Sequence, residues 1–149
     1  LDATVESYDD VLVTLLADVG QAYIEIRALQ KRIELADANV KALGGSRDIA
    51  RARFDAGKTS EVDYLQAQTI LSQTEALIPR LQADLRVANN RLCILLGRPP
   101  EDLVIHMPAA PIPNPPLEVA VGIPADLIRR RPDVRQAERL LAAQCARIG

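Results

Sequence analysis

The chain has 149 residues, a formal net charge of -2, and 48% hydrophobic but only 3% aromatic residues. Its basic and acidic residues are interleaved, which excludes the net basic face that nucleic-acid binding requires. Globular cores usually rely on large aromatic side chains for buried area, so a core of Leu, Ile, Val and Ala indicates thin helix-on-helix packing.

Residues 3–56 are predicted to form one very long helix. Its apolar residues recur at alternating intervals of four and three positions: Tyr8, Leu12, Leu15, Val19, Ala22, Ile26, Leu29, Ile33, Ala36, Val40 and Leu43. The mean interval, about 3.5 residues, keeps such a seam facing a partner helix in a left-handed supercoil.

Gly44 and Gly45 are the weak point of this helix, because each interior glycine costs roughly 1 kcal/mol relative to alanine. The seam nevertheless continues in phase through Arg47, Ala50 and Phe54. We therefore expect a bend or a local loosening at the two glycines. The alternative is a true turn there, which would give a bundle of shorter helices.

A short break over residues 55–60 is predicted to reverse the chain. Gly57 suits the left-handed cap that ends a helix. Thr59 or Ser60 can cap the start of the next helix, and Asp63 follows Ser60 by three residues, as in an acidic variant of the capping box. The break therefore predicts a tight helix-turn-helix.

A second helix is expected over residues 60–96, where the seam returns at Tyr64, Ala67, Leu71, Thr74, Ile78, Leu81, Leu85, Ala88, Leu92 and Leu95. Pro79 lies in its interior, where a lost backbone hydrogen bond and a ring clash normally kink the axis. The fold class predicted for residues 1–97 is therefore all-α, a long antiparallel α-helical coiled-coil hairpin.

Residues 98–123 are dense in proline, which suits extended chain lying against another surface; a flexible linker is the alternative. Pro124 is placed as the first-turn proline of a short helix. Pro132 and Asp133 give a start signal for a further helix, which the end of the chain at residue 149 truncates.

The sequence holds no pattern of catalytic or metal-binding residues. Cys93 and Cys145 lack metal-ligand spacing and are each interpreted as small buried apolar residues. His106 is interpreted as a surface residue. An activated nucleophile, a glycine-rich phosphate loop and a histidine pair for zinc are all missing. We therefore predict no enzyme activity, no catalytic residue, no metal and no cofactor.

No stretch approaches the roughly 18 to 20 apolar residues that a membrane-spanning helix needs, and no start resembles a secretory signal. Because the chain opens in the middle of its pattern, we interpret it as a soluble piece of a longer protein. On that interpretation, membrane contact is made only by parts outside this sequence.

Three motifs carry a resemblance to a known family. The stretch RFDAGKTSEVDYLQA, residues 53–67, resembles the periplasmic tip motif of the TolC-like outer-membrane factors, the exit ducts of tripartite efflux pumps. The stretch RLCILLGRPP, residues 91–100, resembles the end of the same family helix. Residues 122–149 are similar to the segment that opens the family's second repeat. Lipoprotein channels of resistance-nodulation-division pumps are the most similar subgroup.

The resemblance implies a homotrimeric duct in the outer membrane, with this chain on the periplasmic side as part of a tunnel that exports small molecules. The implied partners are a periplasmic adaptor, or membrane fusion, protein and an inner-membrane pump. The implied docking tip comprises Arg53, Gly57, Thr59, Ser60, Glu61, Asp63, Leu65 and Ala67. Gly57 would allow the reversal, Thr59 and Ser60 would cap the new helix, Leu65 and Ala67 would make groove contacts, and the charged residues would make polar contacts.

A structural or adaptor coiled-coil hairpin, a spacer with no conduit role, is the alternative function. The two functions differ in the surfaces they need. A duct requires lateral seams on both flanks of the hairpin and a polar face toward its lumen, whereas a scaffold needs one seam only. Candidates for the polar lining are Gln66, Gln73, Gln82 and Asn89.

Overall fold

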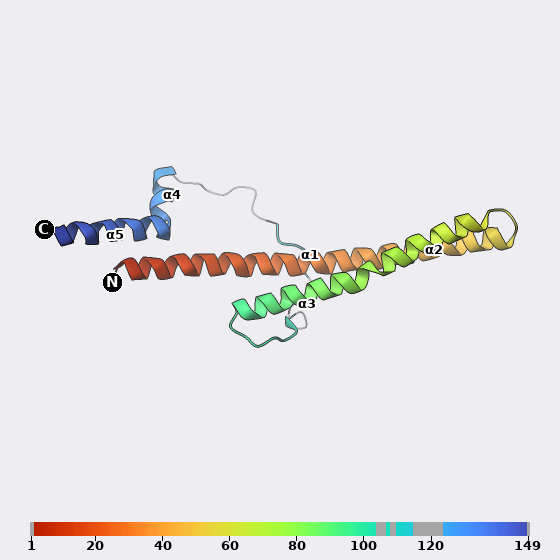
Figure 1. Cartoon of the computed structure of the whole chain (residues 1–149), viewed down its shortest axis with the longest axis horizontal. Coiled ribbons are helices and arrows are strands. Elements are labelled where there is room, and N and C mark those ends of the chain that lie inside the picture. The colour runs from red at the N-terminus through yellow and green to blue at the C-terminus, as the bar shows by residue number, and fades with distance from the viewer. Residues whose placement is uncertain (1, 104–106, 108–109, 115–123, 149) are drawn as a thin grey trace. The chain divides into compact units, whose positions relative to one another are not determined.

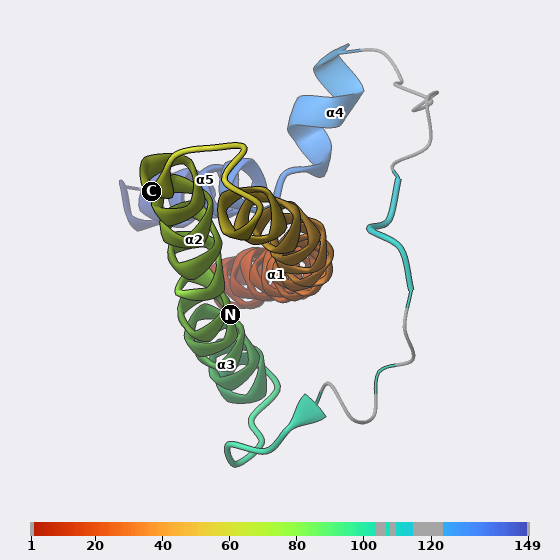
Figure 2. The ribbon, with the colours of Figure 1, turned by 90° about the vertical axis from the view of Figure 1, so that its right-hand side faces the viewer.

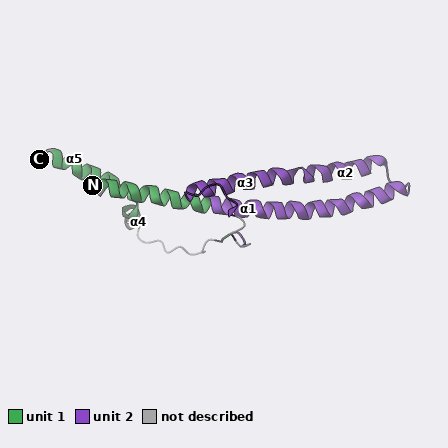
Figure 3. Ribbon diagram, turned by 90° about the horizontal axis from the view of Figure 1, so that it is seen from below, with its two compact units in different colours: residues 1–21, 113–149 green, residues 22–112 purple. Residues whose placement is uncertain are grey.

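The computed structural model is all-α (Figure 1), and it describes residues 2–103, 107, 110–114 and 124–148. Its helices are α1 (Asp2–Asp55), α2 (Glu61–Glu75), α3 (Leu77–Leu95), α4 (Pro124–Arg130) and α5 (Pro132–Ile148). The chain divides into two compact units (Figure 3). One comprises residues 22–112, and the other comprises residues 1–21 with 113–149.

Residues 22–112 contain the antiparallel hairpin that was predicted over residues 1–97. From Ala22 onward α1 runs beside α2 and α3, which return in the opposite direction (Figures 1 and 2). Every seam residue from Ala22 to Leu43 and from Tyr64 to Leu95 is buried or half-buried. The most buried are Ala22, Ile26, Leu29, Leu71, Ala88 and Leu92. The pairing of the two seams is thus confirmed from Ala22 onward, and the small alanines let the helices approach closely. Tyr8, Leu12 and Leu15 of the first seam are exposed, so the buried seam does not extend to them.

Helix α1 continues through Gly44 and Gly45 without ending. The alternative of a true turn at the two glycines is therefore wrong. A Cβ atom added at either glycine would meet nothing within 4 Å, so neither glycine is needed for a close contact within this chain. The packing of the seam on both sides keeps this stretch helical despite its low helix propensity.

The single helix expected over residues 60–96 is instead two helices, because α2 ends at Glu75 and α3 begins at Leu77. Pro79 explains the interruption. It has no N–H to donate to the carbonyl of Glu75, and its ring crowds that carbonyl. Ala76 keeps right-handed helical angles (φ -65°, ψ -18°) and its N–H still donates to Ser72, so the break is one residue long.

The segment after α3 is fastened to that helix by Asn89. The amide Nδ2 of Asn89 donates to the carbonyl of Glu101 at 2.6 Å, and its Oδ1 accepts the N–H of Leu103 at 3.1 Å. Cys93 is fully buried beside it and its Sγ lies 3.4 Å from the same carbonyl. Asn89 is only 6% exposed, so its proposed place in a polar tunnel lining is wrong.

Single side chains in the hairpin and the C-terminal helices add two findings on burial. Arg27, although charged, is only 4% exposed, and it donates to the Tyr23 hydroxyl and to Gln30. Cys145, expected to be buried, is exposed on α5, whereas Cys93 is buried as predicted. His106 and residues 115–123 of the proline-rich segment lie outside the described residues.

In the unit formed by residues 1–21 and 113–149, α5 is tied to the start of α1 by Arg135. Its Nε lies 2.8 Å from Oε2 of Glu6, and its Nη2 donates to Oδ2 of Asp9 at 3.3 Å. At the start of α5, a hydrogen bond from the Arg131 guanidinium holds the pKa of Asp133 below its ordinary value. The two Arg135 pairs join residues far apart in the sequence, which no local pattern predicts.

Candidate functional site

The hairpin tip is built first by the end of α1. Gly57 has a φ of +67°, in the left-handed region where a side chain is strained. Its N–H donates to the carbonyl of Phe54 at 2.8 Å, and the N–H of Lys58 donates to the carbonyl of Arg53 at 2.8 Å. This pair of bonds is a Schellman motif, which satisfies the last carbonyls of the helix and turns the chain out of its axis.

The start of α2 completes the turn with a capping box. The Ser60 side chain accepts the N–H of Asp63 at 3.4 Å, and the Asp63 carboxylate accepts the N–H of Ser60 at 3.2 Å. Ser60, not Thr59, is therefore the N-cap, and the predicted acidic capping box is confirmed. Thr59 is half-buried, and its hydroxyl makes no hydrogen bond within the described part of the chain.

A cluster of aromatic and charged side chains next to the turn was not predicted from the sequence. The rings of Phe54 and Tyr64 stack with centroids 6.4 Å apart. The Arg51 guanidinium lies over the Tyr64 ring at 5.1 Å and donates to Oδ1 of Asp55 at 3.1 Å. Hydrogen bonds to Tyr64 and to Asp55 raise the pKa of Arg51. The available signal was that the last seam residue of one helix and the first of the next are both aromatic.

The predicted tip residues all lie around this turn but differ in what they expose. Arg53 and Glu61 are exposed, and Leu65 is 50% exposed. Asp63 is exposed as well, although its carboxylate is held in the capping box. Ala67 is half-buried in the seam toward α1. Val62, 58% exposed, adds an apolar side chain that sequence reasoning did not single out.

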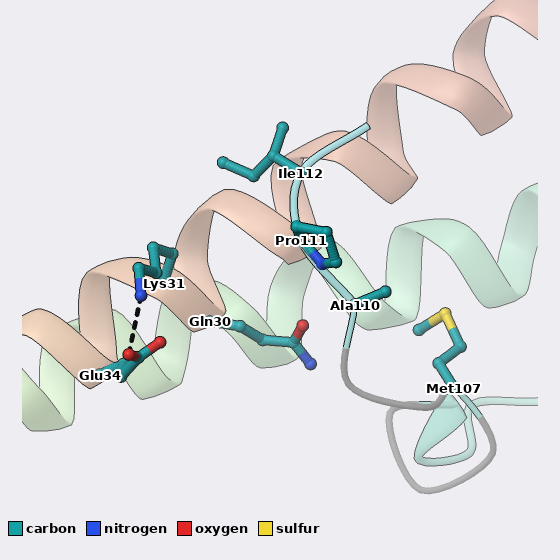
Figure 4. A pocket seen from close by; sticks show the side chains of 7 residues that line it. All are labelled: Gln30, Lys31, Glu34, Met107, Ala110, Pro111 and Ile112. Carbon is teal, nitrogen blue, oxygen red and sulfur yellow. Dashed lines mark hydrogen bonds and ion pairs between the residues drawn. The ribbon is translucent and has the colours of Figure 1, made fainter. Parts of the chain in front are cut away.

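A groove also lies between α1 and the segment after α3 (Figure 4). Its volume is about 790 Å³ and its lining comprises Gln30, Lys31, Glu34, Met107, Ala110, Pro111 and Ile112. The charged groups of Lys31 and Glu34 are 2.7 Å apart and neutralise each other.

Within the described ranges, no group of three or more His, Cys, Asp or Glu residues is placed to hold a metal ion. None of the helices there combines the length and the apolar character that crossing a membrane would require.

Comparisons with known proteins match most or all of the chain to outer-membrane efflux proteins and similar proteins. A family model described as outer membrane efflux protein matches residues 1–98. Nodulation protein T of Rhizobium leguminosarum bv. trifolii is 37% identical, over all of this chain and 32% of that protein. The solvent efflux pump outer membrane protein SrpC of Pseudomonas putida is 34% identical, over 99% of this chain and 31% of that protein.

A solved structure of the outer-membrane channel OprN matches with a TM-score of 0.89 and 36% identity, over 95% of this chain and 32% of that chain. The chain therefore spans about a third of the length of the relatives that it matches.

Proposed function

Because this chain belongs to the outer membrane efflux protein family, we propose that it forms one segment of the periplasmic tunnel of a trimeric efflux duct and docks a periplasmic adaptor through its hairpin tip. Members of this family are transport conduits and not enzymes, in agreement with the absence of a catalytic pattern in the sequence. The transported small molecules would pass from an inner-membrane pump through the duct.

A second 4-3 stripe on α1 is the observation that carries the conduit role. It comprises Ile24, Ala28, Lys31, Leu35, Ala38, Ala42, Gly45, Ile49 and Ala52, all exposed except the half-buried Ala28. At about 3.5 residues per turn, this outer stripe lies roughly 150° around the helix from the seam. Its small residues would let a neighbouring helix approach closely. A duct needs such a second flank, whereas a single-seam scaffold does not.

The outer stripe can be tested with two adjacent substitutions in the full-length protein. Ala38→Lys places a charge on the stripe and is expected to reduce trimer formation at least tenfold, since a buried unpaired charge costs several kcal/mol. Asn39→Lys puts the same side chain beside the stripe and is expected to assemble normally. The trimer fraction is measured by size-exclusion chromatography with light scattering. Normal assembly of the Ala38→Lys protein would favour the scaffold alternative.

For docking, we assign the tip residues to two tasks. Gly57, Ser60 and Asp63 build a turn of defined shape, through the Schellman motif and the capping box. The exposed side chains of Arg53, Glu61 and Leu65 would then make contacts with the adaptor. Thr59 and Ala67 are half-buried and would support the turn from within. An adaptor that binds here would present both apolar and charged groups.

Leu65→Asp in the full-length protein is expected to weaken adaptor binding by about tenfold or more, as loss of a central apolar contact does at other interfaces. The measurement is a pull-down with purified periplasmic adaptors, quantified against adaptor concentration. Leu77→Asp is the matched control, because Leu77 is 51% exposed and Leu65 is 50% exposed. Equal binding by both variants and the parent protein would contradict docking through the tip.

A further inference from the structure

The backbone of α1 is weakest at Gly44, Gly45 and Ser46. Each glycine lowers the helical population at its position by roughly fivefold relative to alanine. The Ser46 hydroxyl donates to the carbonyl of Ala42 at 3.2 Å, four residues back. Hydrogen bonds of this kind compete with the backbone ladder and often bend helices, and Gly/Ser pairs are recognised kink sites.

The second arm of the hairpin, formed by α2 and α3, also has a short stretch in which the helical backbone is weak. The helix is interrupted at Ala76 because Pro79 cannot donate to the carbonyl of Glu75. Two residues before the interruption, the Thr74 hydroxyl donates to the carbonyl of Ile70 at 2.9 Å, the same type of bond that Ser46 makes. Each arm of the hairpin thus contains residues that weaken its helix. Near them, a side-chain hydroxyl donates to the carbonyl four residues back.

Contacts between the two arms of the hairpin place the weak points within about two helical turns of each other along its length. Arg47 donates to Gln68 at 3.3 Å on the side nearer the tip, and Arg91 lies 3.9 Å from Glu25 on the far side. This register sets the two glycines opposite residues 70–72. The interruption at Ala76 then lies about five residues, roughly 7.5 Å, further from the tip, and Pro79 lies about eight residues, roughly 12 Å, further from it. Figure 3 shows α2 and α3 following one another beside α1.

We propose that Gly44–Gly45 and Ala76–Pro79 form one hinge across the hairpin, at which the tip body, residues 46–75, bends as a unit. The tip body is braced at its far end by the Phe54–Tyr64 stack and the capping box. At the hinge, Leu43 is half-buried and Leu71 is buried. The apolar seam therefore keeps the two arms packed together while their backbones bend. The hinge does not depend on the proposed docking role, although docking would be one use for it.

Hydrogen exchange of the full-length protein tests the hinge directly. Amides of residues 41–48 and 74–80 are expected to exchange about tenfold faster than those of residues 27–34 and 84–91, which belong to the same hairpin. If the two stretches open together, Gly44→Ala slows exchange by roughly fivefold in residues 41–48 and also slows it in residues 74–80. Pro79→Ala is expected to have the reciprocal effect across the hairpin.

Gly44 lies beside the outer stripe, so Gly44→Ala leaves that flank unchanged. Gly20→Ala is the matched control, since Gly20 is another α1 glycine with nothing within 4 Å of an added Cβ. It is expected to leave exchange at both hinge stretches unchanged. Effects of Gly44→Ala and Pro79→Ala that stay within their own helices would overturn the hinge. So would wild-type exchange in residues 41–48 no faster than in residues 27–34. Because exchange is measured without adaptor, these outcomes are independent of the docking test.

Discussion

Gly57→Val in the full-length protein is expected to remove most efflux activity while the protein is still made and reaches the membrane. The backbone at Gly57 has a φ of +67°, where a β-branched residue costs about 1–2 kcal/mol or more. An added Cβ meets nothing within 4 Å, so the effect comes from the backbone and not from a clash. Drug susceptibility of a strain that depends on this protein is measured together with its amount in membrane fractions.

Gly97 supplies a matched control for the Gly57 substitution. It has a φ of +66° and ends α3 with the same pair of hydrogen bonds, from Gly97 to Ile94 and from Arg98 to Cys93. Gly97→Val therefore imposes the same strain away from the tip and is expected to reduce efflux much less. Gly57→Asn, which tolerates this conformation, should retain activity. Equal losses from Gly57→Val and Gly97→Val would show a general stability effect and contradict the tip assignment.

Asn89→Ala is expected to release the segment after α3. The substitution removes the Asn89 Oδ1 acceptor of the Leu103 N–H, which keeps its 3.1 Å bond to the carbonyl of Glu101. It also removes the 2.6 Å bond from Asn89 to that same carbonyl. Because the loss of buried hydrogen bonds of this kind costs about 1–3 kcal/mol, the local opening free energy should fall by about that amount. Hydrogen exchange of the Leu103 amide in the full-length protein measures this change.

Asn90 provides the comparison for Asn89, because it is the next residue on the same helix and its side chain is exposed. Asn90→Ala is expected to change Leu103 exchange by less than about twofold, as surface substitutions usually do. If Asn89→Ala also leaves the Leu103 amide protected, the Asn89 bonds do not hold this segment in place.

Sequence periodicity alone determined the main architecture. The 4-3 seams predicted which residues of the hairpin are buried, because a mean interval of about 3.5 residues keeps one face toward a partner helix along its whole length. The tip was also predictable, since Gly57, Ser60 and Asp63 act through bonds to backbone groups within a few residues. The family followed from motifs at the tip and at the end of the second helix.

The tertiary structure decided everything that depends on contacts between distant residues. The sequence placed Asn89 among exposed polar residues, and only the fold brought Glu101 and Leu103 against it. The Arg135 ion pairs with Glu6 and Asp9 join the two ends of the chain in the same way. The sequence marked both Gly44 and Pro79 as places where a helix is weakened, but the helix continues at Gly44 and is interrupted before Pro79. Packing energy sufficed to keep the glycines helical, whereas no packing can supply the N–H that proline lacks.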